Sequence, residues 1–345
     1  MSGDAPSSPS YAHLTELTDH HGIFEHSFHD TARREHGYCV DDVARALIVV
    51  VREPDQTPLL AGHTETYLRF LEGALSVDGL SRNRMTASGE WVDAPGLGDW
   101  WGRSVWALGV ATAQAPLRST RERARHAFDV AASRRSPHMR AMVFATLGAA
   151  EVLRAHSRNH AARALLLAGV AMIPRAPNQV WPWPEARMSY GNASIPEALI
   201  AAGQAVDDIR LIERGLALLR FLLEVETTPG HLSVTGSAGR DPSQQGPLFD
   251  QQPIEVAAIA DACARAFDLT HDPAWLDGVK QCWDWFTGIN DSGTEMYDEE
   301  NGAGFDGLEA HGRNENRGAE STLAALATYQ QARRLEQLRR ATVTR

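Results

Sequence analysis

The sequence of 345 residues predicts an all-α fold, an (α/α)6 toroid in which six inner and six outer helices form a closed barrel. Helical periodicity covers most of the chain, two kinds of helix alternate, and each kind recurs five or six times. The composition, 43% hydrophobic and 22% charged, is that of a folded globular protein. We expect one domain over residues 11–335, with a disordered N-terminus at 1–10 and a basic C-terminal tail at 336–345.

Helices of the first kind consist mainly of small residues. Alanine and glycine let neighbouring backbones approach closely on every side, so these helices belong in the interior. They are VARALIVVV from Val43, VWALGVATA from Val105, MVFATLGAA from Met142, ALIAAGQA from Ala198, VAAIADACARA from Val256 and STLAALATYQQA from Ser321.

Helices of the second kind are amphipathic and have one charged face, which suits an outer layer. They cover about 61–75, 119–133, 157–171, 209–224 and 274–287, with a weaker sixth from Tyr11 to Asp19. The ring closes if this sixth helix pairs with the last inner helix. An open solenoid is the alternative, but the unequal spacing of the inner helices lacks the regular repeat of about 33–47 residues that is typical of solenoids.

The connections between the helices are asymmetric. Links from inner to outer helices are short, whereas most links from outer to inner helices are long, and long loops in a compact domain are often functional. All the long loops are expected at the face where the inner helices begin. They cover 22–38, 77–99, 173–193, 226–252 and 288–317.

Acidic residues occupy the first turn of four inner helices, at Asp42, Glu197, Glu255 and Glu320. Acids favour helix N-termini by about 0.3–1 kcal/mol, and Ser194 to Glu197 has the form of a capping box. A capping role is therefore as good an interpretation of Glu197 as a functional one. For Asp42 and Glu255, the polar neighbouring residues favour function.

Tryptophans and polar side chains gather in the segments that lead into the inner helices. Flat aromatic rings pack against the C–H face of a sugar, while acids, amides and arginines bind its hydroxyl groups, so this combination predicts a sugar-binding site. We expect the following residues to bind substrate: His36, Tyr38, Trp100, Trp101, Arg103, Trp181, Trp183, Tyr190, Asn192, Gln251, Gln252, His311, Asn314, Asn316 and Glu320.

The same segments supply carboxylates for chemistry. Glycoside hydrolysis uses one carboxylic acid as a proton donor and a second carboxylate as base or nucleophile, and crowding in a pocket pushes such pKa values apart. Asp42 and Glu255 are the best candidates. Acids at the N-termini of helices on different sides of a ring would be well separated, which favours the inverting mechanism of glycoside hydrolysis. The alternative catalytic residues are Asp41, Asp99, Glu185, Asp250 and Glu315.

This layout resembles the six-hairpin (α/α)6 toroids of carbohydrate-active enzymes, a superfamily that includes glycoside hydrolases and sugar 2-epimerases. The adjacent pair Asp41 and Asp42 also resembles the Asp-Asp pair of family 76 endo-mannanases. Together with the paired carboxylates, these likenesses lead us to predict a glycoside hydrolase that cleaves an oligosaccharide and needs no cofactor.

Two other functions stay open. A sugar 2-epimerase or a uronate-type lyase would use histidines, for which His36 and His311 are placed suitably, and a non-catalytic toroid would only bind sugar. Zinc is not indicated, because His36 and Cys39 are joined by no further Cys-His cluster. Terpene cyclases of this shape use Asp-x-Asp-Asp, but Cys39 stands where the first aspartate is needed. No GxGxxG, P-loop or GxSxG motif occurs.

The remaining features bear on compartment and partners. The three cysteines include two in apolar helical patterns, the N-terminus lacks the features of a signal peptide, and the longest aliphatic run, Leu47 to Val51, is too short to span a bilayer. The net charge of -11 argues against a nucleic-acid partner. We therefore expect a cytoplasmic protein whose partner is an oligosaccharide, with neither nucleic acid nor membrane.

Overall fold

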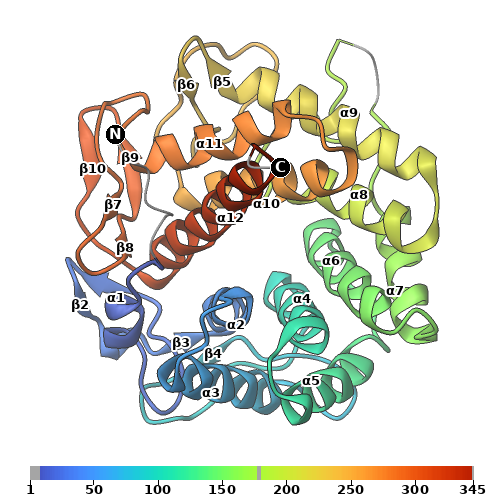
Figure 1. The fold of residues 1–345 in the computed structure, drawn as a ribbon. Helices are drawn as coiled ribbons and strands as arrows, with labels where there is room; N and C mark the ends of the chain where they lie inside the picture. Colours follow the sequence, from blue (N-terminus) through green and yellow to red (C-terminus); the bar gives the residue numbers. More distant parts are fainter. Residues whose placement is uncertain (1–7, 177–179, 344–345) are drawn as a thin grey trace.

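The computed structural model describes residues 8–176 and 180–343 of the chain. Two layers of helices surround a common axis (Figure 1). The inner layer contains the six small-residue segments predicted from the sequence. They form α2 (Val40–Arg52), α4 (Asp99–Gln114), α6 (Met139–Ala155), α8 (Ser194–Val206), α10 (Pro253–Thr270) and α12 (Ala319–Val343).

The outer layer confirms the amphipathic segments. Its members are α1 (Ala12–Glu16), α3 (Pro58–Ala74), α5 (Arg118–Ala131), α7 (His160–Ala171), α9 (Ile209–Glu226) and α11 (Ala274–Phe286). In α9, for example, Leu216, Leu219 and Leu222 are buried against the inner layer, while Glu213 and Arg220 are exposed. The weak sixth helix is present, but it is only five residues long.

The ring closes between the first and last inner helices (Figure 1). Gln330 of α12 donates a hydrogen bond to the carbonyl oxygen of Val49 in α2 at 2.9 Å, and Arg333 forms a buried ion pair with Glu53 at 3.1 Å. Tyr11, just before α1, accepts a second hydrogen bond from Gln330 at 2.9 Å. The fold is therefore the closed (α/α)6 toroid, not an open solenoid.

Glycines explain how closely α4 and α6 pack. A Cβ on Gly148 would lie 2.3 Å from the carbonyl oxygen of Val105, and a Cβ on Gly109 would lie 2.2 Å from that of Gly148. Both distances are far inside van der Waals contact, so only glycine permits this approach of the two backbones. The small residues from which the interior was predicted thus set the spacing of these inner helices.

The long loops contain short antiparallel strand pairs that the sequence did not predict. The 3-10 turn Arg34–His36 lies in the first loop, and every strand has only two or three residues. The pairs are β1 (Ser27–Phe28) with β2 (Thr31–Ala32), β3 (Tyr38–Cys39) with β4 (Arg84–Met85), β5 (Thr227–Thr228) with β6 (His231–Leu232), β7 (Tyr297–Asp298) with β8 (Ala303–Gly304), and β9 (Gly307–Glu309) with β10 (Gly312–Asn314).

One of these pairs joins two loops that are far apart in the sequence. The β3–β4 pair ties the first long loop to the second, and a backbone bridge joins Gln251 to Leu308 between the last two long loops. The loops therefore pack against one another instead of standing free in solvent. This packing changes the environment of several residues that were expected to bind substrate.

The chain ends differ from expectation at one terminus. Residues 336–343, which the sequence analysis assigned to a basic tail, continue α12 to Val343. Of the segment expected to be disordered, 1–10, residues 1–7 lie outside the described residues. In the part of the chain that the structure describes, no helix has both the length and the apolar character needed to cross a membrane.

Candidate functional site

Helix α2 supplies a buried acid at the end of the barrel where the inner helices begin. Asp42 is only 3% exposed, and its carboxylate accepts a hydrogen bond from Arg45 Nη1 at 2.6 Å, one turn later on the same helix. Arg45 Nη2 lies 2.7 Å from Glu320 Oε2 of α12. The Cys39 thiol donates to Asp42 Oδ2 at 3.1 Å. Arg45 thus links the first-turn acids of two neighbouring inner helices.

The protonation of Asp42 follows from this setting. Burial raises the pKa of its carboxyl group, and it outweighs the opposing effect of Arg45, while the negative charge of Glu320 adds to the rise. The resulting pKa is about 7. Asp42 can therefore hold a proton near neutral pH, as a general acid must.

Helix α4 places Arg103 beside the other acid of the pair. Arg103 Nε lies 3.1 Å from Asp41 Oδ1, and the guanidinium group packs on the ring of Phe144 at 4.0 Å from its centre. Burial raises the pKa of Asp41, although the charge of Arg103 opposes this rise. Asp41 and Asp42 are adjacent in sequence, yet each has its own arginine.

Helix α6 contributes Arg140, which is 4% exposed. Its Nε donates to the carbonyl oxygen of Tyr190 at 2.6 Å and its Nη2 donates to Glu185 at 2.7 Å. The hydroxyl of Tyr190 in turn donates to Asp99 at 2.8 Å. Arg140 Nη1 is buried and has no hydrogen-bond partner among the described residues, so one strong donor is free.

Helix α10 presents Glu255 to the loop that precedes α8. Its two oxygens accept hydrogen bonds from the backbone N–H groups of Gly191 at 2.5 Å and Asn192 at 3.1 Å. Burial raises the pKa of Glu255, and these two N–H groups oppose the rise by stabilising the ionised form. Glu255 therefore organises a neighbouring loop, which a residue that only caps its own helix does not do.

These contacts bring most of the predicted catalytic residues into one connected group with three arginines. The carboxylates and arginines alternate, which separates like charges and holds each side chain in a fixed orientation. We call this group the entrance cluster. It consists of Asp41, Asp42, Arg45, Asp99, Arg103, Arg140, Glu185, Tyr190, Glu255 and Glu320.

The predicted role of the tryptophans is wrong for at least two of the four. Trp101 and Trp183 are fully buried, and the indole N–H of Trp101 donates to the carbonyl oxygen of Gly79 at 3.1 Å. Trp181 is 8% exposed and packs edge-on against Phe221. Trp100 is half-buried and donates to the carbonyl oxygen of Ser81. These rings pack within and beneath the long loops.

Two other expected substrate contacts are structural. Tyr38 is fully buried, stacks on Phe24 and donates its hydroxyl to Asp19 at 2.8 Å. The Gln251 side chain is also fully buried, where it donates to Asp291 at 2.6 Å and accepts from the Trp285 indole at 3.1 Å. With every polar atom of its amide group used in packing the loops, Gln251 has little left for a ligand.

The remaining predicted residues lie in the loops around the entrance cluster. His36 packs edge-on against His26 with ring centres 5.1 Å apart, and His311 is exposed between β9 and β10. Asp250 is exposed and is joined by a side-chain hydrogen bond to Gln252. Glu315 is exposed and pairs with Arg313 at 3.1 Å.

The two asparagines of the last long loop are used within the loops. Asn314 accepts a hydrogen bond from the backbone N–H of Asn316 at 3.1 Å, and Asn316 accepts one from that of His29 at 3.0 Å. Asn192, by contrast, is fully buried and its side-chain nitrogen has no partner among the described residues. Asn192 therefore has a buried free donor beside the entrance cluster.

Glu197 is neither a cap nor part of the entrance cluster. The helix begins at Ser194, and no side-chain hydrogen bond caps it. The Glu197 carboxylate instead accepts from Arg265 Nε at 3.1 Å and lines a cavity among the later turns of the inner helices. The matching position in the sequence therefore did not mean a matching position in the site.

Sequence reasoning missed three residues of this region, Arg45, Arg140 and Glu226. Arg45 follows Asp42 by three positions, a spacing that places both on one helix face and could have revealed it. Arg140 lies just after the short basic turn into α6. Glu226 ends α9, is fully buried, and accepts a hydrogen bond from the backbone N–H of Thr235 at 3.0 Å; nothing in its amphipathic helix pattern indicated this.

Among the described residues, one group has the proximity needed for a metal ion, formed by Glu25, Cys39 and Asp42 with ligand atoms within 4.8 Å of one another. Arg45 pairs with Asp42, and Arg84 pairs with Glu25. A cation at this position would have to displace two guanidinium groups. This donor set therefore does not fit a resident metal ion, and we assign none to it.

No protein-family model and no curated sequence matches the chain. Solved structures do match. A sugar epimerase from a ruminal bacterium superposes with a TM-score of 0.69 at 13% identity, over 92% of this chain and 95% of its own. Cellobiose 2-epimerase from Bacillus thermoamylovorans gives 0.69 at 10% identity, over 93% and 96%.

Glycoside hydrolases share the architecture as well. A family 76 α-mannanase from Bacteroides thetaiotaomicron gives a TM-score of 0.61 at 12% identity, over 94% of each chain. The chain therefore shares the fold of these structures. This agrees with the toroid predicted from its alternating helices.

Proposed function

We propose that the chain is a carbohydrate-active enzyme that hydrolyses a glycosidic bond of an oligosaccharide at the entrance cluster. The observation that carries this proposal is the buried carboxyl group of Asp42, whose pKa is raised to about 7 beside other carboxylates. The fold supports it, since structures of this shape include glycoside hydrolases and sugar epimerases.

In the proposed reaction, Asp42 gives its proton to the glycosidic oxygen as the bond to the leaving sugar breaks. The carboxylate that forms is stabilised by Arg45 at 2.6 Å and by the Cys39 thiol at 3.1 Å. Both donors are already in position, so little rearrangement is needed when the charge develops.

Glu255 is the proposed base. Its two backbone hydrogen bonds favour the ionised form, in which it can take a proton from an attacking water molecule. It lies on α10, whereas Asp42 lies on α2, and α12 stands between these helices in the ring (Figure 1). Acid and base on separate helices suit the wider spacing of an inverting mechanism.

The free donors of the site would hold the sugar. Arg140 Nη1 and Asn192 Nδ2 are buried without hydrogen-bond partners among the described residues. Hydroxyl oxygens of a substrate can accept from both, which would remove the cost of leaving them unpaired. Tyr190, 48% exposed, provides an aromatic ring at the same place.

Sugar 2-epimerisation is the second candidate, and one observation favours it. His26 and His36 pack against each other in the first long loop, and His26 lies 3.7 Å from Glu25, whose charge also affects Asp42. Two imidazoles beside an acidic site could move the C2 proton of a sugar. His311, exposed between β9 and β10, shows no such packing.

Isotope labelling separates the two reactions. The purified chain would be incubated with gluco- and manno-oligosaccharides in water enriched in oxygen-18 and, separately, in deuterium oxide. Hydrolysis predicts new reducing ends that carry oxygen-18 on one product, whereas epimerisation predicts deuterium at C2 without chain cleavage. C2 labelling without new reducing ends would replace our first proposal by the second.

Substitution then tests the residues. Asp42→Asn should lower turnover by about 10²-fold or more, because general acid catalysis typically contributes 10²–10⁴-fold. Glu255→Gln should lower turnover by a similar factor. The matched control is Asp277→Asn, because Asp277 is exposed on α11. Near-normal turnover by both Asp42→Asn and Glu255→Gln would refute the assignment.

A further inference from the structure

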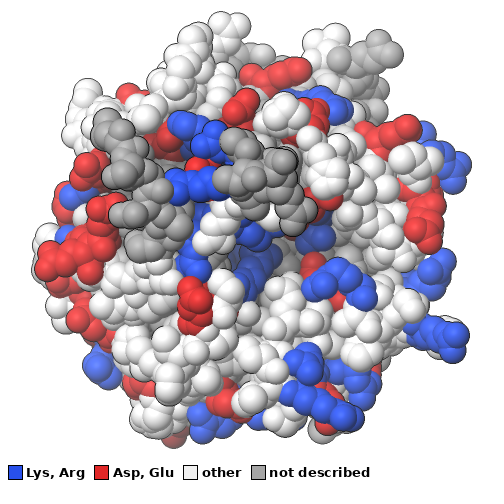
Figure 2. Space-filling model, viewed as in Figure 1, with Lys and Arg blue, Asp and Glu red and all other residues white. Residues whose placement is uncertain are grey.

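A large cavity lies away from the entrance cluster. It has a volume of about 990 Å³ and is lined by later turns of the inner helices, from Arg52 of α2 to Gln337 of α12. In the view along the ring axis, Figure 2 shows a hollow at the centre of the molecule with basic side chains (blue) inside it. No residue of the entrance cluster is among the described residues that line this cavity.

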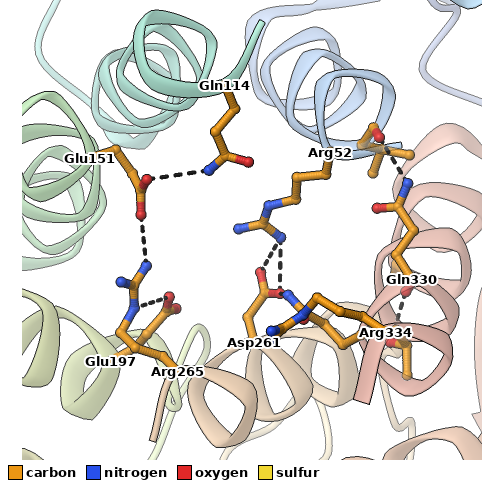
Figure 3. A network of polar contacts seen from close by, with 12 residues as sticks. Arg52, Gln114, Glu151, Glu197, Asp261, Arg265, Gln330 and Arg334 are labelled. Atoms are coloured by element: carbon orange, nitrogen blue, oxygen red, sulfur yellow. Dashed lines mark hydrogen bonds and ion pairs between the residues drawn. The ribbon is translucent and has the colours of Figure 1, made fainter. Parts of the chain in front are cut away.

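Carboxylates already neutralise the arginines of the cavity wall. Arg52 of α2 donates to both oxygens of Asp261 on α10, at 2.9 and 2.8 Å. Arg265, also on α10, lies 3.1 Å from Glu151 on α6 and 3.1 Å from Glu197 on α8. Figure 3 shows these pairs facing one another across the cavity from four different inner helices.

The same holds for the other three arginines of the lining. Arg154 pairs with Glu151 at 2.9 Å, Arg333 with Glu53 at 3.1 Å, and Arg334 with Asp268 at 2.9 Å. A phosphate or sulfate group would have to displace these carboxylates from their arginines. An ammonium group would meet five guanidinium groups. The wall therefore favours a ligand with no net charge.

Three polar atoms of the lining residues are buried without a hydrogen-bond partner in the described chain. They are Glu197 Oε2, Gln330 Oε1 and Arg333 Nη1. Glu197 is 1% exposed and Arg333 is 6% exposed. Buried polar atoms are nearly always paired, so free ones at a cavity indicate a missing partner. The set includes both a donor and acceptors, and a hydroxyl group can serve both.

We propose that this cavity is a second binding site, for a small neutral polyhydroxylated molecule such as a monosaccharide or disaccharide. The volume lies within the range of small-molecule sites, about 300–1,000 Å³. No aromatic side chain is among the described lining residues, so the ligand is held by hydrogen bonds and not by stacking. The proposal does not rest on hydrolysis at the entrance cluster.

The protonation of Glu197 is consistent with a neutral ligand. Burial raises the pKa of its carboxyl group to about 7, and the opposing charge of Arg265 is the next largest influence. In the protonated form, Oε2 or its proton can bond to a hydroxyl group in either direction. The ionised form of this group would repel an anionic ligand.

Binding to the full chain tests the proposal. Isothermal titration would use glucose, mannose, cellobiose and mannobiose, with glucose 6-phosphate and glucosamine as charged counterparts. Ala205→Trp puts a large side chain into the cavity at an uncharged lining position, and Glu197→Gln keeps the shape of the side chain but removes its charge. Asp42→Asn and Glu255→Gln are matched changes at the entrance cluster, and thermal unfolding checks that each variant is folded.

We expect at least one neutral sugar to bind, about tenfold more weakly to Ala205→Trp and about two- to tenfold more weakly to Glu197→Gln, with unchanged affinity in the entrance variants. If Ala205→Trp does not fold, Glu197→Gln carries the test. The proposal is overturned if none of the four sugars binds more tightly than about 10 mM, if a charged counterpart binds more tightly, or if only the entrance variants weaken binding. Failure of hydrolysis would show instead in the product assay.

Discussion

The carboxyl group of Glu226, at the end of α9, lies close enough to Glu255 for the negative charge of Glu255 to raise its pKa. Burial is the larger cause, and the pKa of Glu226 reaches about 7. One backbone N–H of Thr235 bonds to its Oε1, while Oε2 has no partner among the described residues. The barrel therefore contains an acid whose ionisation opposes folding.

The first prediction follows from Glu226. A pKa raised from 4.5 to about 7 means that the folded chain binds this proton more tightly than the unfolded chain. The contribution of Glu226 to the free energy of unfolding therefore falls as the pH rises from about 4.5 to about 7, by up to roughly 3 kcal/mol. Glu226→Gln cannot ionise, so its stability relative to the original chain should increase between pH 5 and pH 8, as measured by urea unfolding.

The control for this prediction is on the same helix. Glu224 is exposed on α9, so Glu224→Gln should change the stability by nearly the same small amount at both pH values. An equal effect of Glu226→Gln at pH 5 and pH 8 would show that Glu226 is ionised in the folded chain across this range.

The second prediction concerns the pH dependence of turnover. If Asp42 is the general acid, kcat/KM should fall about tenfold per pH unit above about pH 7, since the proton is lost there. The negative charge of Glu320 raises the pKa of Asp42, so Glu320→Gln should shift this alkaline limb to lower pH. Rates between pH 5 and pH 9 measure the shift.

An exposed acid nearby is the comparison for Glu320. Glu315 precedes the same helix and pairs with Arg313, and it is not among the main influences on Asp42. Glu315→Gln should leave the alkaline limb in place. An alkaline limb that moves equally in both variants would point to general charge effects and not to the contact that Arg45 makes between Asp42 and Glu320.

The fold could be predicted because its cause is local. Small residues such as Gly109 and Gly148 are needed wherever two backbones meet closely. The composition of each inner segment therefore indicates by itself that the helix lies in the interior. Amphipathic patterns marked the outer layer for the same reason. Neither signal depends on how distant segments pack.

The site was only partly predictable, because its chemistry depends on contacts between distant segments. Asp42 and Glu255 were found from their place in the first turn, but Glu197 had the same placement and faces a different cavity. Trp101 lies in the first turn of α4 and Trp183 in the long loop before α8, and periodicity in these segments does not reveal that the loops fold back and bury both rings. Arg140 contacts Glu185 and Tyr190 across more than forty positions, a relation that periodicity does not encode.

The third prediction tests the close packing of α4 and α6. Gly148→Ala would place a Cβ 2.3 Å from the carbonyl oxygen of Val105, so one of the two helices must move. We expect a loss of about 1–3 kcal/mol in the free energy of unfolding, as for other overpacked interiors. Gly62→Ala is the control, because Gly62 is exposed in α3 with nothing within 4 Å of the added carbon.

The two alanine substitutions should have opposite effects. Alanine favours a helix over glycine by about 0.5–1 kcal/mol, so Gly62→Ala should stabilise the chain. Chemical unfolding of both variants gives the comparison. A neutral or stabilising Gly148→Ala would mean that α4 and α6 lie further apart in solution than described here.

The fourth prediction concerns Arg140 as a group that holds the substrate. Its planar side chain makes three hydrogen bonds and leaves Nη1 free, whereas a lysine ammonium in the same place cannot reproduce this fork. Arg140→Lys should therefore raise KM by about tenfold, the equivalent of about 1.4 kcal/mol of lost binding, with a smaller effect on kcat. Arg135→Lys, in the exposed turn before α6, should change neither constant. A fall in kcat at constant KM would instead place Arg140 at the reacting atoms, because such a loss reports an interaction made only in the transition state.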